Sequence, residues 1–149
     1  MKVAINGLGR IGRHVLKLCI EKRVKIVAIN DLTDANTLCY LLNHDSVYKN
    51  FNKKIEAEKD FLKIGRKKIK VLKEPFPERL PWKELGVDIV IESTGRFRDR
   101  NDAKKHLDAG AKKVLISAPA KDPDKTIVLG VNDKELKKQL TFIKNNYSL

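Results

Sequence analysis

Short apolar runs recur along the chain, each bounded by glycine, proline, asparagine or charged residues. Runs of this length that are rich in valine and isoleucine are typical of strands buried in a parallel sheet, because both faces of such a strand are covered. We expect six buried strands, at residues 2–6, 24–30, 69–72, 87–92, 113–117 and 126–131. A further short run at residues 140–143 is a candidate for one more strand.

Between these runs, apolar residues recur every three or four positions, as they do on the buried face of an amphipathic helix. The first helix follows the first strand, and its expected buried residues are Ile11, Val15, Leu18 and Cys19. A second helix is expected over residues 35–43, with Asp34 as its N-cap. Its expected buried residues are Leu38, Leu41 and Leu42.

Later helices are shorter. We expect one turn at residues 82–85, after the proline-rich loop at 74–81, and a helix from about Asp99 that ends at Gly110. The latter should bury Ala103 and Leu107. A short helix at 133–138 should bury Leu136, while residues 45–53 are polar and predict a loop.

Residues 54–74 differ from the rest, because short apolar runs lie close together with a turn at Gly65. This pattern predicts a small antiparallel hairpin or meander that leads into the strand at 69–72. The alternation of strands and helices elsewhere predicts an α/β fold with a doubly wound, mainly parallel sheet, the Rossmann fold. Residues 1–149 are expected to form one dinucleotide-binding domain, with no internal repeat and no linker.

Three glycines lie between the first strand and the first helix, at G-x-G-x-x-G spacing: Gly7, Gly9 and Gly12. Gly7 permits a sharp turn, Gly9 lets the backbone approach a pyrophosphate, and Gly12 lets the helix pack close to the strand. The free N–H groups at the start of the helix then face the phosphates. This motif alone is weak evidence for dinucleotide binding, and it becomes stronger only with a carboxylate at the end of the second strand.

The second part of the signature is Asp31, which stands at the end of the second strand, nineteen residues after Gly12. A carboxylate at this place accepts hydrogen bonds from the adenosine ribose, and it would repel a 2′-phosphate. Asp31 therefore favours NAD over NADP. The alternative, that Asp31 only caps a turn, stays open at this stage.

A third group is Ser93-Thr94-Gly95, at the end of the strand at 87–92. Small residues there let a ligand lie against the backbone at the carboxyl end of a strand, where α/β sheets bind their ligands. The three histidines, His14, His44 and His106, have no Ser or Cys placed to pair with them, and no metal-type cluster is seen. We expect them to be structural or surface residues.

The chain is strongly basic, with 32 Lys and Arg against 19 Asp and Glu and a net charge of +13. This charge suits anionic ligands and leaves open a non-enzymatic role as a nucleotide- or RNA-binding or interaction module. The lysines are spread along the chain, however, which is typical of a solvated surface. No aromatic RNA-recognition motif is present.

No apolar run reaches 18 residues, so no membrane span is expected. The strand at 2–6 begins directly after Met1, and we expect no signal peptide. Cys19 and Cys39 are expected to be free thiols and core residues rather than nucleophiles. Together these features predict a cytoplasmic protein.

With these residues laid out, the chain resembles the N-terminal, NAD-binding domain of the glyceraldehyde-3-phosphate dehydrogenase family. The resemblance covers nearly all of the chain and rests on eight ordered segments. They are residues 6–13 (NGLGRIGR), 28–34, 37–47, 67–72, 80–82, 92–97 (ESTGRF), 106–122 and 127–132. The related erythrose-4-phosphate dehydrogenase has similar motifs and remains an alternative.

The resemblance implies a role in cofactor binding for several residues. Arg10 and Ile11 would offer backbone N–H groups to the pyrophosphate, and Asp31 would hold the adenosine ribose. Ser93, Thr94 and Gly95 would line the cofactor.

Two further roles come from the resemblance alone. Phe97 would pack beside the adenine end, and Ser117 would lie near the nicotinamide end. The alternatives for these two residues are ordinary packing and the end of a strand.

The family's active-site motif, Ser-Asn-Ala-Ser-Cys-Thr-Thr-Asn, is not present. Aligned without gaps, Ser148 matches the second serine of the motif, and Leu149 falls where the catalytic cysteine belongs. The resemblance therefore implies that the catalytic domain is absent and that the chain binds NAD without turning over an aldehyde. The family forms homotetramers, and we expect this chain to self-associate. A truncated remnant without activity is a further alternative.

Overall fold

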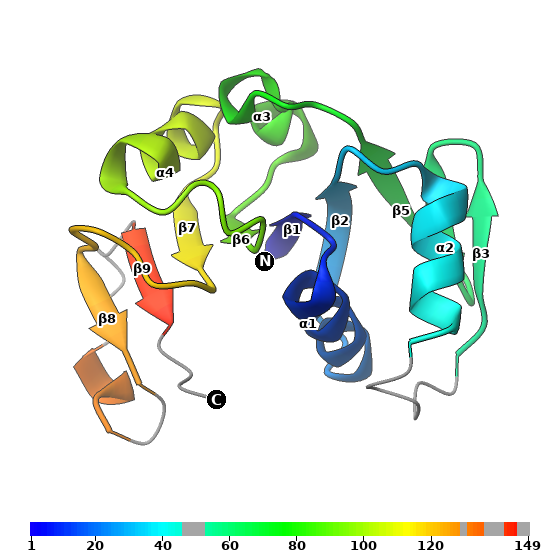
Figure 1. The fold of residues 1–149 in the computed structure, drawn as a ribbon, viewed down its shortest axis with the longest axis horizontal. Helices are drawn as coiled ribbons and strands as arrows, with labels where there is room; N and C mark the ends of the chain where they lie inside the picture. Colours follow the sequence, from blue (N-terminus) through cyan, green and yellow to red (C-terminus); the bar gives the residue numbers. More distant parts are fainter. Residues whose placement is uncertain (46–52, 129–130, 136–141, 146–149) are drawn as a thin grey trace.

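The computed structural model describes residues 1–45, 53–128, 131–135 and 142–145. Its helices are α1 (Arg10–Glu21), α2 (Ala35–Asn43), α3 (Trp82–Leu85) and α4 (Arg100–Asp108), with 3-10 turns η1 (Pro77–Arg79) and η2 (Asp133–Glu135). Figure 1 shows α1 and α2 on one side of the strands and α3 and α4 on the other. The described strands are β1 (Lys2–Asn6), β2 (Lys25–Asn30), β3 (Ile55–Glu58), β4 (Phe61–Ile64), β5 (Lys67–Leu72), β6 (Ile89–Glu92), β7 (Lys113–Ile116), β8 (Lys125–Ile127) and β9 (Phe142–Asn145).

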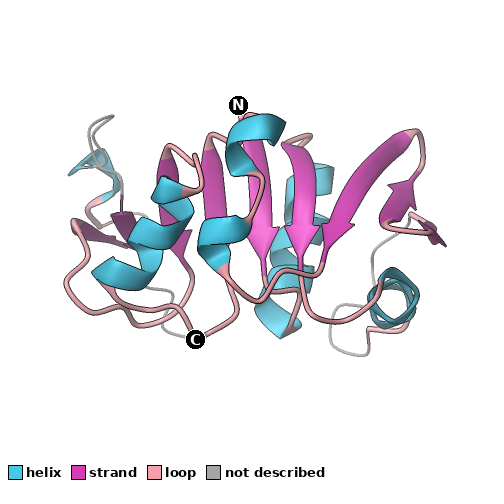
Figure 2. Ribbon diagram, turned by 90° about the horizontal axis from the view of Figure 1, so that it is seen from above, coloured by secondary structure: helices cyan, strands magenta, loops and turns pink. Residues whose placement is uncertain are grey.

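These strands form one sheet in the order β3-β4-β5-β2-β1-β6-β7-β9-β8. The central strand β1 pairs in parallel with β2 and with β6, so the carboxyl ends of the three strands meet at one edge (Figure 2). Asn6 lies opposite Asn30 on one side and opposite Glu92 on the other. The predicted doubly wound, mainly parallel sheet is confirmed.

The hairpin predicted for residues 54–74 is also present. Strand β4 runs antiparallel to both β3 and β5, and β5 then joins β2 in parallel. The turn between β4 and β5 contains Gly65, whose φ of +60° lies in the left-handed region. The small antiparallel unit thus extends one edge of the parallel sheet.

The other edge of the sheet consists of β8 and β9. The strand expected at 126–131 is β8, which is described only over Lys125–Ile127, and the additional strand is β9. Strand β9 lies between β7 and β8 and is parallel to both. The helix expected at 133–138 is described only as the turn η2. Leu136, most of the predicted 45–53 loop, Ser148 and Leu149 lie outside the described residues.

The prediction for the buried face of α1 is wrong for Ile11 and Leu18, whereas Val15 and Cys19 pack against the core as predicted. Ile11 and Leu18 are 44% and 41% exposed, and Val15 and Cys19 are half-buried. The buried residues of the helix are Gly12, Leu16, Lys17 and Ile20. A Cβ on Gly12 would lie only 2.0 Å from the Gly7 carbonyl oxygen, so this glycine presses the helix against the strand and sets its rotation.

The other helices agree better with the sequence pattern. Asp34 caps α2 by accepting a hydrogen bond from the Thr37 N–H at 3.0 Å, while Leu38 and Leu42 are buried and Leu41 is half-buried. In α4, Ala103 is buried and Leu107 is half-buried. His106, which precedes Leu107, is the second buried residue of this helix. Gly110 follows α4 with a φ of +104°.

Candidate dinucleotide-binding site

The glycine turn joins β1 to α1 and is held by backbone contacts. The Gly7 N–H donates to the Asn30 carbonyl at 2.8 Å, which fixes the turn beside the end of β2. Gly7 has a φ of +91°, and a Cβ there would lie 2.7 Å from the Thr94 nitrogen. Only glycine fits both this conformation and this space. Gly7 therefore permits the sharp turn and Gly12 the close packing of helix and strand, as predicted.

Gly9 differs from the other two glycines, because no atom lies within 4 Å of the place where its Cβ would be. It is the N-cap of α1 and gives the helix no side-chain cap. The first bond of the helix runs from the Arg13 N–H to the Gly9 carbonyl, so the N–H groups of residues 10–12 lie at its open end. An open approach, free donors and the positive end of the helix dipole together suit a phosphate group.

Asp31 lies beside this helix end and braces the glycine turn. Its Oδ2 accepts a hydrogen bond from the Leu8 N–H at 2.7 Å, and its Oδ1 accepts one from the Thr33 N–H at 2.9 Å. Each carboxylate oxygen keeps a second lone pair for another donor. The side chain is thus held in one orientation at the cleft, where it can accept hydrogen bonds from the hydroxyl groups of a ribose.

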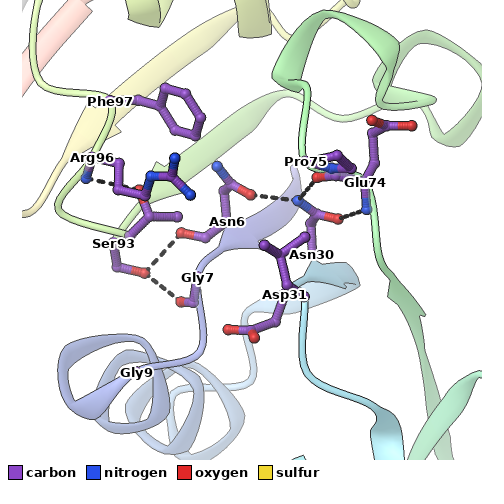
Figure 3. Close-up of a pocket in the computed structure, with 12 residues that line it drawn as sticks. Asn6, Gly7, Gly9, Asn30, Asp31, Glu74, Pro75, Ser93, Arg96 and Phe97 are labelled. Carbon is purple, nitrogen blue, oxygen red and sulfur yellow. Dashed lines mark hydrogen bonds between the residues drawn. The ribbon is translucent and has the colours of Figure 1, made fainter.

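The bend after β6 forms the opposite wall. The Ser93 hydroxyl donates to the Gly7 carbonyl at 2.7 Å and also lies 3.1 Å from the Asn6 carbonyl (Figure 3). The Thr94 N–H donates to Glu92 Oε1 at 2.7 Å, and Gly95 has a φ of +71°. The bend is therefore tied to both β1 and β6.

These elements enclose a cleft of about 270 Å³. Six of the predicted site residues are among those that line it: Gly7, Gly9, Asp31, Ser93, Thr94 and Phe97. Arg10, Ile11 and Gly12 form the first turn of α1 next to Gly9, and Gly95 follows Thr94 in the bend. Ser117 lies further away, where its N–H and its hydroxyl both donate to the Glu92 carbonyl at 3.0 Å.

The sequence patterns missed other lining residues, namely Asn6, Asn30, Leu32, Glu74, Pro75 and Arg96. Two of them form a chain of amides across the floor of the cleft (Figure 3). Asn30 Nδ2 donates to Asn6 Oδ1 at 2.7 Å and to the Glu74 carbonyl at 2.9 Å, while the Glu74 N–H donates to Asn30 Oδ1. The only sequence signal for these hydrogen-bonded amides was that Asn6 and Asn30 are polar residues at the last positions of buried strands.

The cysteines and histidines form no nucleophilic site in the part of the chain that the structure describes. Cys19 and Cys39 are both free thiols on helices, and neither lines the cleft. Burial raises the pKa of both thiols, which keeps them protonated and unreactive. The described residues contain no group of three metal-ligating side chains and no helix long and apolar enough to cross a membrane.

The residues present fit a dinucleotide. Gly9 leaves room for a pyrophosphate at a helix N-terminus, Asp31 presents a carboxylate for a ribose, and Phe97 offers an aromatic wall. A doubly wound sheet with this turn at the switch between β1 and β6 defines a nucleotide-binding domain of the Rossmann class.

Comparison with known proteins identifies the family within this class. Residues 1–100 match the family model described as "Glyceraldehyde 3-phosphate dehydrogenase, NAD binding domain". The chain belongs to this family, and NAD is the cofactor of the domain.

Several curated relatives are similar over nearly the whole chain. Glyceraldehyde-3-phosphate dehydrogenase of Thermotoga maritima is 54% identical over 95% of the chain, and that of Geobacillus stearothermophilus is 50% identical over 99%. The enzyme of Borreliella burgdorferi is 49% identical over 97%. The chain spans 44–45% of the length of these relatives.

Proposed function

We propose that this chain binds NAD in the cleft between the glycine turn and the Thr94 bend. The parent activity would be that of a glycolytic glyceraldehyde-3-phosphate dehydrogenase, in which NAD accepts the hydride of the aldehyde carbon and inorganic phosphate accepts the oxidised acyl group. The observation that carries the proposal is the fixed Asp31 carboxylate beside the open end of α1 at Gly9. A carboxylate at this place also selects NAD over NADP by repelling a 2′-phosphate.

Different residues of the site would bind different parts of NAD. The N–H groups of Arg10 and Ile11 would bind the pyrophosphate, and Asp31 would bind the adenosine ribose. The residues from Ser93 to Gly95 would contact the cofactor through the backbone and small side chains.

The two ends of the cofactor would lie on different parts of the sheet edge. Phe97 lines the cleft and would pack beside the adenine. Ser117 would lie near the nicotinamide, beyond the end of β7. In this orientation of NAD, the adenosine would lie in the cleft and the nicotinamide ring would lie toward the end of β7.

We propose further that a polypeptide of these 149 residues does not itself oxidise the aldehyde. Oxidation in this family proceeds through a thiolate, and the sequence holds only Cys19 and Cys39. Both lie on helices outside the cleft, and the pKa of each thiol is raised by burial. Residues 1–149 would thus serve in cofactor binding rather than in the oxidation step.

The chain would also self-associate, consistent with the homotetramers implied by the resemblance. Leu32, Tyr40 and Phe76 are large apolar residues that the fold leaves exposed, and β3 and β8 are the outermost of the described strands. Sedimentation velocity at rising protein concentration tests this point, and a sharp monomer at all concentrations would contradict it.

We assign the protein to the cytoplasm because free thiols persist in a reducing compartment.

The net charge of +13 favours one alternative, a basic RNA-binding or interaction module. Calorimetric titrations of the chain with NAD, NADP and a single-stranded RNA separate the two functions. We expect saturable NAD binding, at least tenfold weaker NADP binding, and RNA binding that is weak and lost at high salt. Tight RNA binding without any NAD binding would overturn the proposed function.

A further inference from the structure

A network of buried polar side chains lies directly beneath the cleft, and the cofactor roles assigned above do not use it. Glu92, the last residue of β6, is 1% exposed, and His106 of α4 is 0% exposed. Asn6 and Asn30 are also buried. Buried polar groups cost free energy unless they are hydrogen-bonded, so their partners determine what this network does.

The Glu92 carboxylate is fully provided with donors. Oε1 accepts hydrogen bonds from the N–H and the hydroxyl of Thr94. Oε2 accepts from Asn6 Nδ2 and from His106 Nε2, the latter at 3.0 Å. Four donors fill the acceptor positions of an ionised carboxylate, which makes Glu92 the point where the bend, β1 and α4 are joined.

Trp82 determines which nitrogen of His106 carries the proton. The Trp82 indole N–H can only donate, and it lies 3.0 Å from His106 Nδ1. Nδ1 is therefore the acceptor, and the ring hydrogen is on Nε2, where it donates to Glu92. The tryptophan thus orients the imidazole toward the carboxylate.

His106 also contacts Phe97, a second residue that lines the cleft. The Phe97 ring stands edge-on to the His106 ring, with centroids 6.4 Å apart and an interplanar angle of 90°. Phe97 lines the cleft, and Thr94, held by Glu92, lines it as well. His106 therefore contacts Phe97 directly and reaches Thr94 through a single carboxylate.

We propose that His106 is a positioning residue of the dinucleotide cleft, which holds the Thr94 bend in its binding conformation through the hydrogen bond to Glu92. The inference rests on the proposed function, because it takes NAD as the ligand of the cleft. His106 lies beneath the cleft and is no part of its lining. Its effect on the cofactor is transmitted through Glu92 to the N–H and hydroxyl of Thr94.

A residue that serves only the core would behave differently. Its replacement would lower the stability of the whole domain but leave the folded cleft unchanged. Leu107, the next residue of α4, offers this comparison, because it packs with Ala103, Val114 and Ile116 away from the cleft. The variant Leu107→Ala is therefore the matched control.

Two substitutions of His106 separate its hydrogen bonds from its ring. His106→Phe keeps an aromatic ring beside Phe97 but removes the donor to Glu92. In His106→Gln the amide nitrogen can donate to Glu92 while its oxygen accepts from Trp82, so both hydrogen bonds are retained without a ring. Urea unfolding of each variant establishes the conditions in which all of them are folded.

The first measurement is the Kd for NAD by calorimetry in these conditions. We expect about a tenfold rise for His106→Phe, equivalent to about 1.4 kcal/mol. We expect less than about a threefold rise for His106→Gln and for Leu107→Ala. Equal affinities for His106→Phe and the wild type, or equal losses for His106→Phe and Leu107→Ala, would overturn the inference.

The second measurement does not depend on NAD. Amide hydrogen exchange at Thr94 reports the bond from its N–H to Glu92. We expect faster exchange at Thr94 in His106→Phe than in His106→Gln or Leu107→Ala, and unchanged exchange there would overturn the inference. A wild-type chain that fails to bind NAD would overturn the proposed function, and the exchange rates would still decide whether His106 orders the bend.

Discussion

Thr94 occupies the space that a side chain on Gly7 would need. A Cβ on Gly7 would come within 2.8 Å of three Thr94 atoms, among them the backbone nitrogen and Cα. The end of β1 and the bend after β6 are therefore in direct backbone contact. The three glycines of the turn differ in how much space they leave for a methyl group.

The glycines predict separate effects on stability and on binding. Gly12→Ala should lower the free energy of unfolding by about 3 kcal/mol, because its methyl group would overlap the Gly7 carbonyl. Gly9→Ala should cost only about 0.5 kcal/mol, the difference between Gly and Ala at an N-cap. It should nevertheless raise the Kd for NAD at least tenfold, because the methyl group would occupy the approach to the pyrophosphate.

Urea unfolding and calorimetry of the two variants check these values. The informative variant is Gly9→Ala, since its effect on folding is expected to be small. Unchanged NAD affinity in this variant would show that no phosphate lies against Gly9.

Asp31 is expected to affect both the glycine turn and the choice of cofactor. Asp31→Ala removes the acceptor of the Leu8 and Thr33 N–H groups and the partner of the ribose. We expect NAD binding to weaken at least tenfold, and the ratio of NAD to NADP affinity to fall toward one, because the repulsion of a 2′-phosphate is lost. Parallel titrations with the two cofactors measure this ratio, and an unchanged ratio would contradict the role of Asp31.

A buried ion pair ties α1 to the residue two positions beyond α2. Lys17 Nζ lies 3.4 Å from Asp45 Oδ2, with the side chains 6% and 5% exposed, and Arg13 Nε lies 3.6 Å from the same oxygen. Asp45→Asn should lower the free energy of unfolding by about 3 kcal/mol, because it removes the charge of the carboxylate that faces the buried Lys17 ammonium and the Arg13 guanidinium. Glu58→Gln, which breaks the exposed pair with Lys68, should have much less effect in the same urea titration.

Asp88 predicts a dependence of stability on pH. The Lys112 ammonium at 2.6 Å and the Lys2 N–H at 2.7 Å hold the pKa of this carboxyl below its usual 3.8. Because the pKa is lower in the folded state, the stabilisation is present above about pH 4 and is lost as the pH falls through the folded value. Asp88→Asn should therefore be less stable than the wild type at pH 7, and this difference should shrink as the pH falls below about 4.

Thermal unfolding across this range measures the difference. The variant Asp108→Asn, at the exposed end of α4, is the control and should match the wild type at pH 7. A stability difference for Asp88→Asn that stays constant down to pH 2 would contradict the assignment.

The sequence predicted those features that local rules decide. The glycine turn, the Asp34 cap and the strand ending before Asp31 each depend on residues close together in the chain. The hairpin was predictable from short runs and a glycine turn at Gly65. These signals define the fold class and the two halves of the site.

The sequence did not predict features that depend on distant contacts. The close contact between Gly12 and the Gly7 carbonyl sets the rotation of α1 about its axis. This contact leaves Ile11 and Leu18 exposed, although they belong to the larger apolar face of the helix. The Glu92–His106 network joins four elements, β1, β6, α3 and α4, that no sequence spacing relates. His106 lies 100 residues from Asn6 in the chain, and its burial appears only once α4 packs beside β6.

The position of the cofactor is the central claim, and amide NMR spectra of the chain titrated with NAD test it most directly. We expect the largest shifts at Gly9, Arg10 and Ile11 and at Thr94 and Gly95, the two walls of the cleft, with saturation at one equivalent. Residues of β3 and β4 at the far edge of the sheet should not move. Shifts that are spread over the lysine-rich surface, or that spare the glycine turn, would contradict a dinucleotide site at the ends of β1 and β6.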